Sequence, residues 1–211
     1  MPLPRFHRLP PERRREILET ARSHFARDGP DNASYNAITA AAGLSKSAAY
    51  QYFDGRQDLL AAVLDGVRDR LTTALGPWRD AGTAEEFWAG LRAGSRRLVR
   101  HLAAHPDDLA LADAAVTRAA GQEWTGWFAT VLDNGRALGV VRDDVDRRLM
   151  LSATMAVMHT ADRWALRRVT DPVGGFRADD ADDTEQVWSL LAGLWGPRTA
   201  GRTAGGSERD G

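Results

Sequence analysis

The sequence predicts an all-helical protein built from two domains. Strand signals are nearly absent, because no run alternates apolar and polar residues over more than a few positions. Apolar residues instead recur at helical spacing in several segments that glycines and prolines separate. The length of 211 residues is enough for one domain of ordinary size and a smaller one. Cysteine is absent from the sequence, which excludes disulfides, thiolate metal sites and cysteine nucleophiles.

Composition and charge divide the chain. Residues 1–10 are expected to form a flexible, proline-punctuated arm, 11–56 the smaller domain, 57–196 the larger domain and 197–211 a disordered tail. The first 56 residues hold nine basic and six acidic side chains, while the whole chain has a net charge of -1. This distribution favours an anionic partner for the N-terminal segment alone. Neither a signal peptide nor an apolar stretch of about 20 residues is recognisable, so we expect a cytoplasmic protein.

The smaller domain is expected to open with an amphipathic helix. Pro11 suits its first turn, where a missing N–H costs nothing. Ile17, Ala21 and Phe25 fall on one face, which predicts that this face packs against the rest of the domain. Gly29 and the proline after it end the helix.

Two short helices that flank a glycine follow, and this is the pattern of a helix-turn-helix. Ser34 is placed to cap the first of them, and Ile38 gives it an inward face. Gly43 supplies a turn position that tolerates a positive φ angle, and Ser45 caps the second helix.

The outward face of the second short helix has the residue types of a DNA recognition helix. Lys46 suits a phosphate or guanine contact, and Gln51 can pair with adenine or bond other base edges. Hydroxyl groups on this helix can reach phosphates, and Arg56, together with the start of the next helix, can hold another. The alternative is that the aromatic residues pack in the core of a small helical domain. The residues expected to face outward are Lys46, Ser47, Tyr50 and Gln51, and those expected to face inward are Ala49 and Phe53. The hydroxyl groups that can reach phosphates are those of Ser47, Tyr50 and Tyr52.

A long helix after residue 55 is expected to connect the two domains, because its apolar residues recur at i, i+3 and i+4. Glycines and prolines then divide the larger domain into further helices. These helices are expected near 83–104, 106–117, 121–136, 144–169 and 182–195. The stripe of the connecting helix consists of Leu59, Leu60, Val63, Leu64, Val67 and Leu71.

The region from Arg13 to Val63 strongly resembles the DNA-binding domain of the TetR family of transcriptional regulators. The resemblance rests on the REIL opening, Phe25, the run AAGLSKSAAYQYF and the DLLAAV segment. It implies a homodimer whose N-terminal helices bind a palindromic operator, and a larger helical domain whose small effector weakens DNA binding, as in a repressor. The DNA contacts that it implies are Tyr35, Asn36, Lys46, Ser47, Ala48, Tyr50, Gln51, Tyr52 and Arg56.

Three positions depart from the family pattern. Thr39 stands where the family usually has alanine, and its hydroxyl can bond back to its own helix. Ala48 stands where the family often has a threonine that bonds phosphate. This change removes an anchor of about 1 kcal/mol and allows a contact with a thymine methyl group. Arg56 replaces the usual lysine.

The last two helices carry residues suited to a dimer interface. The segment 147–168 is apolar on nearly all sides over its first half, as in a helix buried by both a core and an interface. In the TetR family the last two long helices form a four-helix bundle with their symmetry mates, so the resemblance implies a dimer face at Trp188, Leu191 and Trp195. Ordinary packing within one chain is the alternative for each of these side chains.

A ligand pocket is expected in the larger domain. Three aromatic residues share a helix face and suit a hydrophobic or aromatic effector, although core packing is the alternative. A histidine and an arginine one turn apart on a neighbouring helix could orient such a ligand, although a core histidine is again the alternative. The candidate lining residues are Trp124, Trp127, Phe128, Met155, His159 and Arg163.

Catalytic and cofactor motifs are not recognisable. The sequence HLAAH places His101 and His105 at i, i+4, but it lacks the glutamate of the zinc protease motif, so we interpret it as helix surface. GxSxG, P-loop and GxGxxG patterns do not occur, and neither a cofactor nor a metal is expected. Two alternatives to a specific regulator stay open. One is a small helical enzyme or ligand-binding protein without specific DNA binding, and the other is a sequence-tolerant DNA binder.

Overall fold

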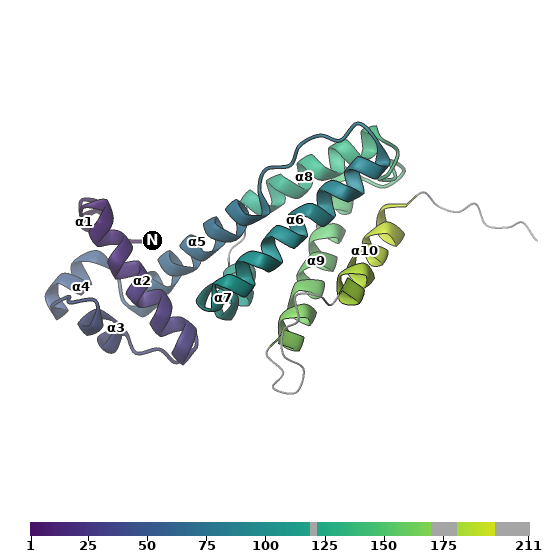
Figure 1. The fold of residues 1–211 in the computed structure, drawn as a ribbon. Helices are drawn as coiled ribbons and strands as arrows, with labels where there is room; N and C mark the ends of the chain where they lie inside the picture. Colours follow the sequence, from purple (N-terminus) through teal and green to yellow (C-terminus); the bar gives the residue numbers. More distant parts are fainter. Residues whose placement is uncertain (119–121, 170–180, 197–211) are drawn as a thin grey trace, which may run out of the picture.

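The computed structural model describes residues 1–118, 122–169 and 181–196, and the regular structure within these ranges is helical throughout (Figure 1). The smaller end of the molecule consists of α1 (Pro4–His7), α2 (Pro11–Asp28), α3 (Tyr35–Ala41) and α4 (Lys46–Tyr52). The larger part follows with α5 (Arg56–Leu75), α6 (Ala84–Ala104), α7 (Pro106–Arg118), α8 (Gln122–Ala137), α9 (Arg147–Val169) and α10 (Ala181–Trp195). The all-helical class is confirmed. The expected tail over 197–211 and the expected breaks at Gly121 and over 171–175 lie outside the described residues.

The helices of the larger part agree closely with the expected ranges, and the one notable shift has a local cause. Helix α9 begins at Arg147 and not near residue 144. Asp146 precedes it, and its Oδ1 accepts hydrogen bonds from the backbone N–H groups of Leu149 and Arg148 at 3.0 and 2.9 Å. These two bonds lower the pKa of Asp146, so its carboxylate stays ionised and caps the helix.

Residues 1–10 do not form the expected flexible arm. The single turn α1 packs against the smaller end, and Phe6 is 3% exposed within its core. The ring centroids of Phe6 and Phe53 are 4.7 Å apart, and the backbone N–H of Leu3 donates to the carbonyl oxygen of Tyr52 at 2.9 Å. The expectation was wrong because Phe6 and Leu9 alone, between two prolines, are too few to show a helical period, yet Phe6 is large enough to fill a core position.

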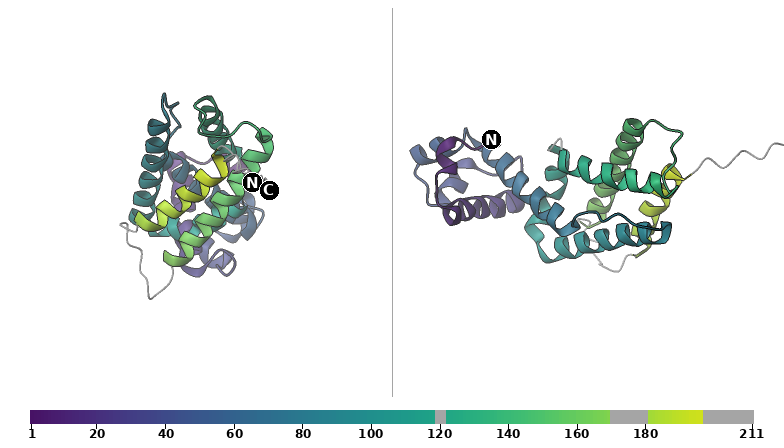
Figure 2. Two further views of the ribbon diagram at one scale, coloured as in Figure 1. Left: turned by 90° about the vertical axis from the view of Figure 1, so that its right-hand side faces the viewer. Right: turned by 90° about the horizontal axis from the view of Figure 1, so that it is seen from above.

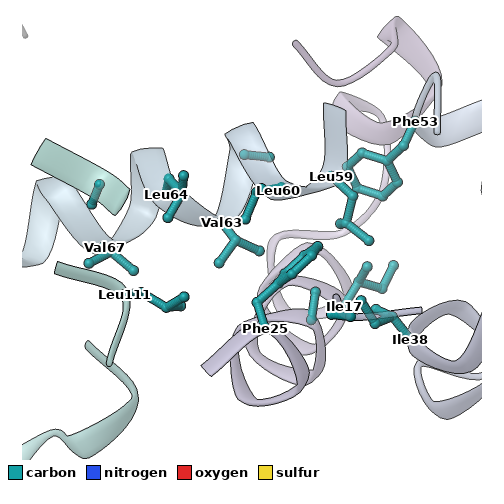
Figure 3. Packing of buried hydrophobic residues seen from close by; sticks show 14 of the residues in the cluster. Ile17, Phe25, Ile38, Phe53, Leu59, Leu60, Val63, Leu64, Val67 and Leu111 are labelled. Carbon is teal, nitrogen blue, oxygen red and sulfur yellow. The ribbon is translucent and has the colours of Figure 1, made fainter. Parts of the chain in front are cut away.

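One hydrophobic core joins the smaller end to the connecting helix. Figure 3 shows Phe25 of α2 beside Val63 of α5, and further along α5 it shows Val67 facing Leu111 of α7. The same core therefore continues past residue 56, and α5 contributes to both parts of the molecule. The division of the chain into 11–56 and 57–196 stays a prediction.

A second core fills the larger part between α6, α8, α9 and α10. The indole N–H of Trp195 donates to the Thr154 Oγ1 at 2.9 Å inside this core, and Trp88 of α6 stacks on the same indole at a centroid distance of 5.7 Å. Helix α10 is therefore held against α9 and α6 by aromatic packing and one buried hydrogen bond.

The expected dimer face at Trp188, Leu191 and Trp195 is wrong. These side chains are 7%, 0% and 0% exposed in a single chain, and they lie in the second core. Helical spacing identified the buried side of α10, but it does not say whether the same chain or a second one covers that side. The alternative of packing within one chain is confirmed. The left view of Figure 2 shows α9 and α10 side by side in front of the other helices.

A charged cluster joins the smaller end to the larger part. Asp108 of α7 is 0% exposed, and its carboxylate accepts hydrogen bonds from Arg22 of α2 at 2.9 Å and from Arg70 of α5 at 2.7 and 2.9 Å. The Nε2 atom of His101 on α6 lies 2.9 Å from the same carboxylate. Burial raises the pKa of Asp108, but the bonds from Arg70 and His101 and the charges of Arg70 and Arg22 outweigh it and lower the pKa to about 2. We call these four residues the Asp108 cluster.

The interpretation of HLAAH as helix surface holds for only one of its histidines. His101 belongs to the Asp108 cluster and its side chain is 15% exposed, whereas His105 is exposed and stacks on it at a ring centroid distance of 4.1 Å. Within the described ranges, no three histidine, aspartate or glutamate side chains gather as they would around a metal ion. None of the helices in those ranges has the length and apolarity needed to cross a membrane.

Candidate nucleic-acid interface

Helix α4 is held in a defined orientation by its cap and by the turn before it. The Ser45 Oγ accepts a hydrogen bond from the Ala48 backbone N–H at 3.2 Å, and Ser34 caps α3 in the same way. Gly43 adopts a φ of 66°, which favours glycine. Arg13 of α2 donates to the carbonyl oxygen of Ala42 at 2.7 Å and ties this turn to the first long helix. Both caps and the turn glycine that the sequence predicted are confirmed.

The two sides of α4 have opposite environments. Ala49 is 1% exposed and Phe53, directly after the helix, is 0% exposed, so one side is buried. Tyr50 is 52% exposed on the other side. The alternative of a packed aromatic core is therefore correct for Phe53 and wrong for Tyr50. We define the α4 face as the exposed residues Lys46, Ser47, Tyr50 and Gln51.

Tyr35 supports the exposed tyrosine of the α4 face. The ring centroids of Tyr35 and Tyr50 are 5.6 Å apart, and the Tyr35 hydroxyl donates to the carbonyl oxygen of Phe53 at 3.5 Å. Burial, together with the neighbouring Tyr50, Asp58 and Asp54, raises the pKa of the Tyr35 hydroxyl, so it stays protonated and can donate. Tyr35 is half-buried, which suits a residue that positions Tyr50.

The other residues expected to contact DNA lie around this face in different environments. Asn36 of α3 is exposed, while Ala48 is half-buried. Tyr52 is half-buried, with its ring centroid 6.2 Å from that of Phe6. The Arg56 guanidinium donates to the carbonyl oxygen of Pro30 at 2.6 Å, so part of it is already engaged within the chain.

Thr39 makes the local bond that the sequence suggested. Its hydroxyl donates to the carbonyl oxygen of Asn36 at 3.2 Å, and the residue is 6% exposed. The threonine therefore satisfies its buried hydroxyl within its own helix.

Arg5 of α1 is a neighbour of the α4 face that sequence reasoning missed. Its guanidinium donates a hydrogen bond to the Oε1 of Gln51. The two residues are 46 positions apart in the sequence, so local spacing could not reveal the contact. The available signal was composition, because the first eight residues hold two arginines around one phenylalanine.

The aromatic candidates for the ligand site occupy one helix but different surroundings. Trp124 of α8 packs against the first core, and its indole N–H is buried without a hydrogen-bond partner in the described ranges. Trp127 packs against the second core and donates to the carbonyl oxygen of Gly76 at 2.9 Å, so it acts as a structural residue. Phe128 is 4% exposed and contacts Trp127 edge to face.

The polar ligand candidates lie on α9 next to α7. The Nε2 of His159 is 3.5 Å from the Thr117 hydroxyl, and Arg163 forms an exposed ion pair with Asp113 at 3.6 Å. Met155, one turn before His159, is half-buried. A single pocket formed by these and the aromatic residues stays a prediction.

The comparisons with known proteins address the smaller end and the overall fold. Residues 17–63 match the family model described as bacterial regulatory proteins, tetR family. Among solved structures, a candidate tetR family transcription regulator from Shewanella sp. PV-4 superposes with a TM-score of 0.64 at 18% identity, over 88% of this chain and 99% of the other. The chain has the fold of a tetR family transcription regulator.

Two further solved structures cover a similar share of the chain. A TetR family transcriptional regulator from Chloroflexus aurantiacus J-10-FL has a TM-score of 0.57 at 21% identity, over 92% of this chain and 96% of its own. The fatty acid degradation regulator FadR from Bacillus halodurans has a TM-score of 0.58 at 16% identity, over 85% of this chain and 97% of its own. No curated protein sequence matches the chain. The segment matched by the tetR family model contains the α4 face, whereas Arg5, Phe6 and Asp108 lie outside it.

Proposed function

We propose that this protein is a transcription regulator that binds a palindromic DNA operator as a homodimer through α4. The observation that carries the proposal is the two-sided environment of α4, a short capped helix with one buried side and an exposed face of Lys46, Ser47, Tyr50 and Gln51. Such a helix fits the major groove and presents donors to phosphates and base edges. The proposed contacts also include Tyr35, Asn36, Ala48, Tyr52 and Arg56.

Selection from random double-stranded DNA at about 0.15 M salt tests this proposal, since non-specific binding is already weak at that concentration. We expect a palindrome whose half-sites are about 34–36 Å apart, the spacing of successive major grooves on one side of the duplex. The variant Lys46→Ala with Tyr50→Ala should lose this selectivity and keep its unfolding temperature, because both side chains are exposed. Recovery of DNA without any motif would support a sequence-tolerant binder instead.

The dimer face that we propose is the exposed side of α9 and α10. Leu149 of α9 and Leu190 of α10 are each 61% exposed, so a single chain leaves apolar surface of both helices in contact with water. Ala156 and Gly193 are exposed on the same two helices and permit a close approach of a second chain. Helices α9 and α10 pack against each other, so these residues can form one self-complementary surface.

We also propose that a small hydrophobic or aromatic effector in the larger part releases the protein from DNA. The buried indole N–H of Trp124 supports this, because a buried donor without a partner is costly unless a bound group accepts from it. The DNA selection should therefore be repeated after unfolding and refolding of the purified protein. A gain of selectivity after refolding supports a co-purified effector. If selectivity is unchanged and all of the purified protein can bind DNA, the result contradicts a co-purified effector.

A further inference from the structure

The turn α1 docks onto the C-terminal end of α4. Phe6 is 3% exposed and its ring lies against those of Phe53 and Tyr52. The backbone N–H of Leu3 donates to the carbonyl oxygen of Tyr52, the last residue of α4, at 2.9 Å. The carbonyl groups at a helix end have no partner within the helix, so this bond satisfies one of them. The buried Phe6 ring and the Leu3 backbone bond therefore hold α1 beside the α4 face, and neither contact involves an exposed side chain.

This docking places Arg5 against Gln51. The Arg5 guanidinium donates to the Oε1 of Gln51. Arginine carries only donors, so the atom that faces it must be the amide oxygen of Gln51, whichever way the amide group is drawn. One of the two lone pairs of this oxygen is then occupied, whereas both N–H groups of the Gln51 amide remain available to a ligand.

The bond to Arg5 changes what Gln51 can recognise. Bidentate pairing with adenine needs the glutamine oxygen to accept from the adenine N6 amino group while the NH2 donates to N7. We propose that Arg5 is a positioning residue that fixes the Gln51 amide and favours its role as a donor, directed at a hydrogen-bond acceptor of the DNA. This acceptor is O6 or N7 of guanine, O4 of thymine or a phosphate oxygen; adenine N7 is disfavoured because the N6 amino donor lies beside it. The inference rests on the proposed DNA-binding function.

A double-mutant cycle on the selected operator tests the positioning role. Affinity is measured at one salt concentration for wild type, Arg5→Ala, Gln51→Ala and the double variant. If Arg5 acts through Gln51, the two effects are not additive, and we expect a coupling of about threefold or more in Kd. The matched control is Arg8→Ala, which removes an exposed arginine of the same N-terminal segment. This control should weaken binding to all sequences alike and show no coupling to Gln51.

Base preference distinguishes the two sources of the acceptor. If Gln51 reads a base, wild type selects guanine or thymine at one position, Gln51→Ala loses that preference, and Arg5→Ala shifts it toward adenine by about fivefold or more. If Gln51 contacts a phosphate, Gln51→Ala weakens binding to all sequences alike, and the coupling to Arg5 remains.

Two results would overturn the inference and leave the proposed function intact. One is a wild-type preference for adenine at a position that Gln51→Ala relaxes and Arg5→Ala leaves unchanged, because Arg5 would then have no effect on the base that Gln51 reads. The other is additive effects of Arg5→Ala and Gln51→Ala on an operator that wild type does select. A wild type that selects no operator, before or after refolding, would overturn the proposed function and this inference together. All these variants change exposed side chains, so their unfolding temperatures should match that of wild type.

Discussion

Asp108 connects four helices of the molecule. Its carboxylate is bound by side chains from α2, α5 and α6 while it belongs to α7 itself. A buried carboxylate is costly unless its lone pairs are satisfied, and here Arg22, Arg70 and His101 satisfy them. Because α2 belongs to the smaller end and α7 to the larger part, Asp108 couples the position of the smaller end to the rest of the fold.

Replacement of Asp108 by asparagine should lower the free energy of unfolding by about 3 kcal/mol at pH 7, since Arg22, which is 14% exposed, and Arg70 would both lose the buried carboxylate that they share. The folded pKa of about 2 lies below the ordinary value of 3.8, so the ionised form stabilises the fold above pH 4. This contribution of about 2 kcal/mol should disappear as the pH falls from 4 to 2.

Urea unfolding at pH 7, 5 and 3 measures the difference between wild type and Asp108→Asn. The control is Asp107→Asn, because Asp107 is 35% exposed and bonds mainly the Ser23 hydroxyl at 2.8 Å. That variant should cost under about 1 kcal/mol at each pH. A difference for Asp108→Asn that is the same at pH 7 and pH 3 would contradict the assigned role of its carboxylate.

At the scale of elements, α4 depends on its surroundings for stability. A helix of seven residues is too short to form alone in water. Its start is capped by Ser45, its end receives the Leu3 N–H, and its buried side rests on the first core through Phe53. The α4 face is therefore ordered in the free protein, which would lower the entropy cost of the proposed DNA binding.

Replacement of the Ser45 cap tests whether operator binding depends on an ordered α4 helix. Ser45→Ala should destabilise the protein by about 1 kcal/mol, and Ser34→Ala at the start of α3 should cost a similar amount. Only the first change lies at the start of α4, so Ser45→Ala should also weaken operator binding while Ser45→Thr, which keeps a capping hydroxyl, restores both. Chemical denaturation and DNA titration of the three variants measure this. Equal loss of affinity in Ser34→Ala and Ser45→Ala would show that order at the start of α4 has no special role.

At the scale of the whole molecule, the smaller end and the proposed dimer face lie at opposite ends. In the right view of Figure 2, α1 to α4 lie at one end and α10 near the other, with α5 running between them. A dimer formed through α9 and α10 would leave both α4 faces accessible, as simultaneous binding to two half-sites requires.

Introducing a charged side chain into the proposed dimer face tests whether the dimer forms there. Leu190→Arg and Leu149→Arg should each convert the dimer to a monomer, because each places an unpaired charge in a desolvated interface. Analytical ultracentrifugation at micromolar concentration measures the mass. Ala103→Arg on the exposed side of α6 is the matched control and should remain a dimer. A wild-type monomer at that concentration, or a dimer that survives both leucine changes, would reject this face.

Local patterns determined the elements of this protein. The all-helical class, the helix limits, the caps at Ser34 and Ser45 and the turn at Gly43 all follow from neighbours within a few positions of one another. The inward side of α4 follows in the same way, since Ala49 and Phe53 are set by helical spacing. Such features depend on backbone dihedrals and on residues i to i+4, and these can be read directly from the sequence.

Only the tertiary structure decided what each buried or polar group meets. The sequence suggested that Phe6 lies in an unstructured arm, whereas the structure packs it against Phe53. The sequence likewise suggested an interface role for Trp195, whereas its indole N–H donates to Thr154 within the chain. The partners of Asp108 come from three other helices, and Arg5 meets Gln51 across 46 positions of sequence. Burial and electrostatic pairing act between atoms that the fold brings together, whatever their separation along the chain, so no local pattern contains them.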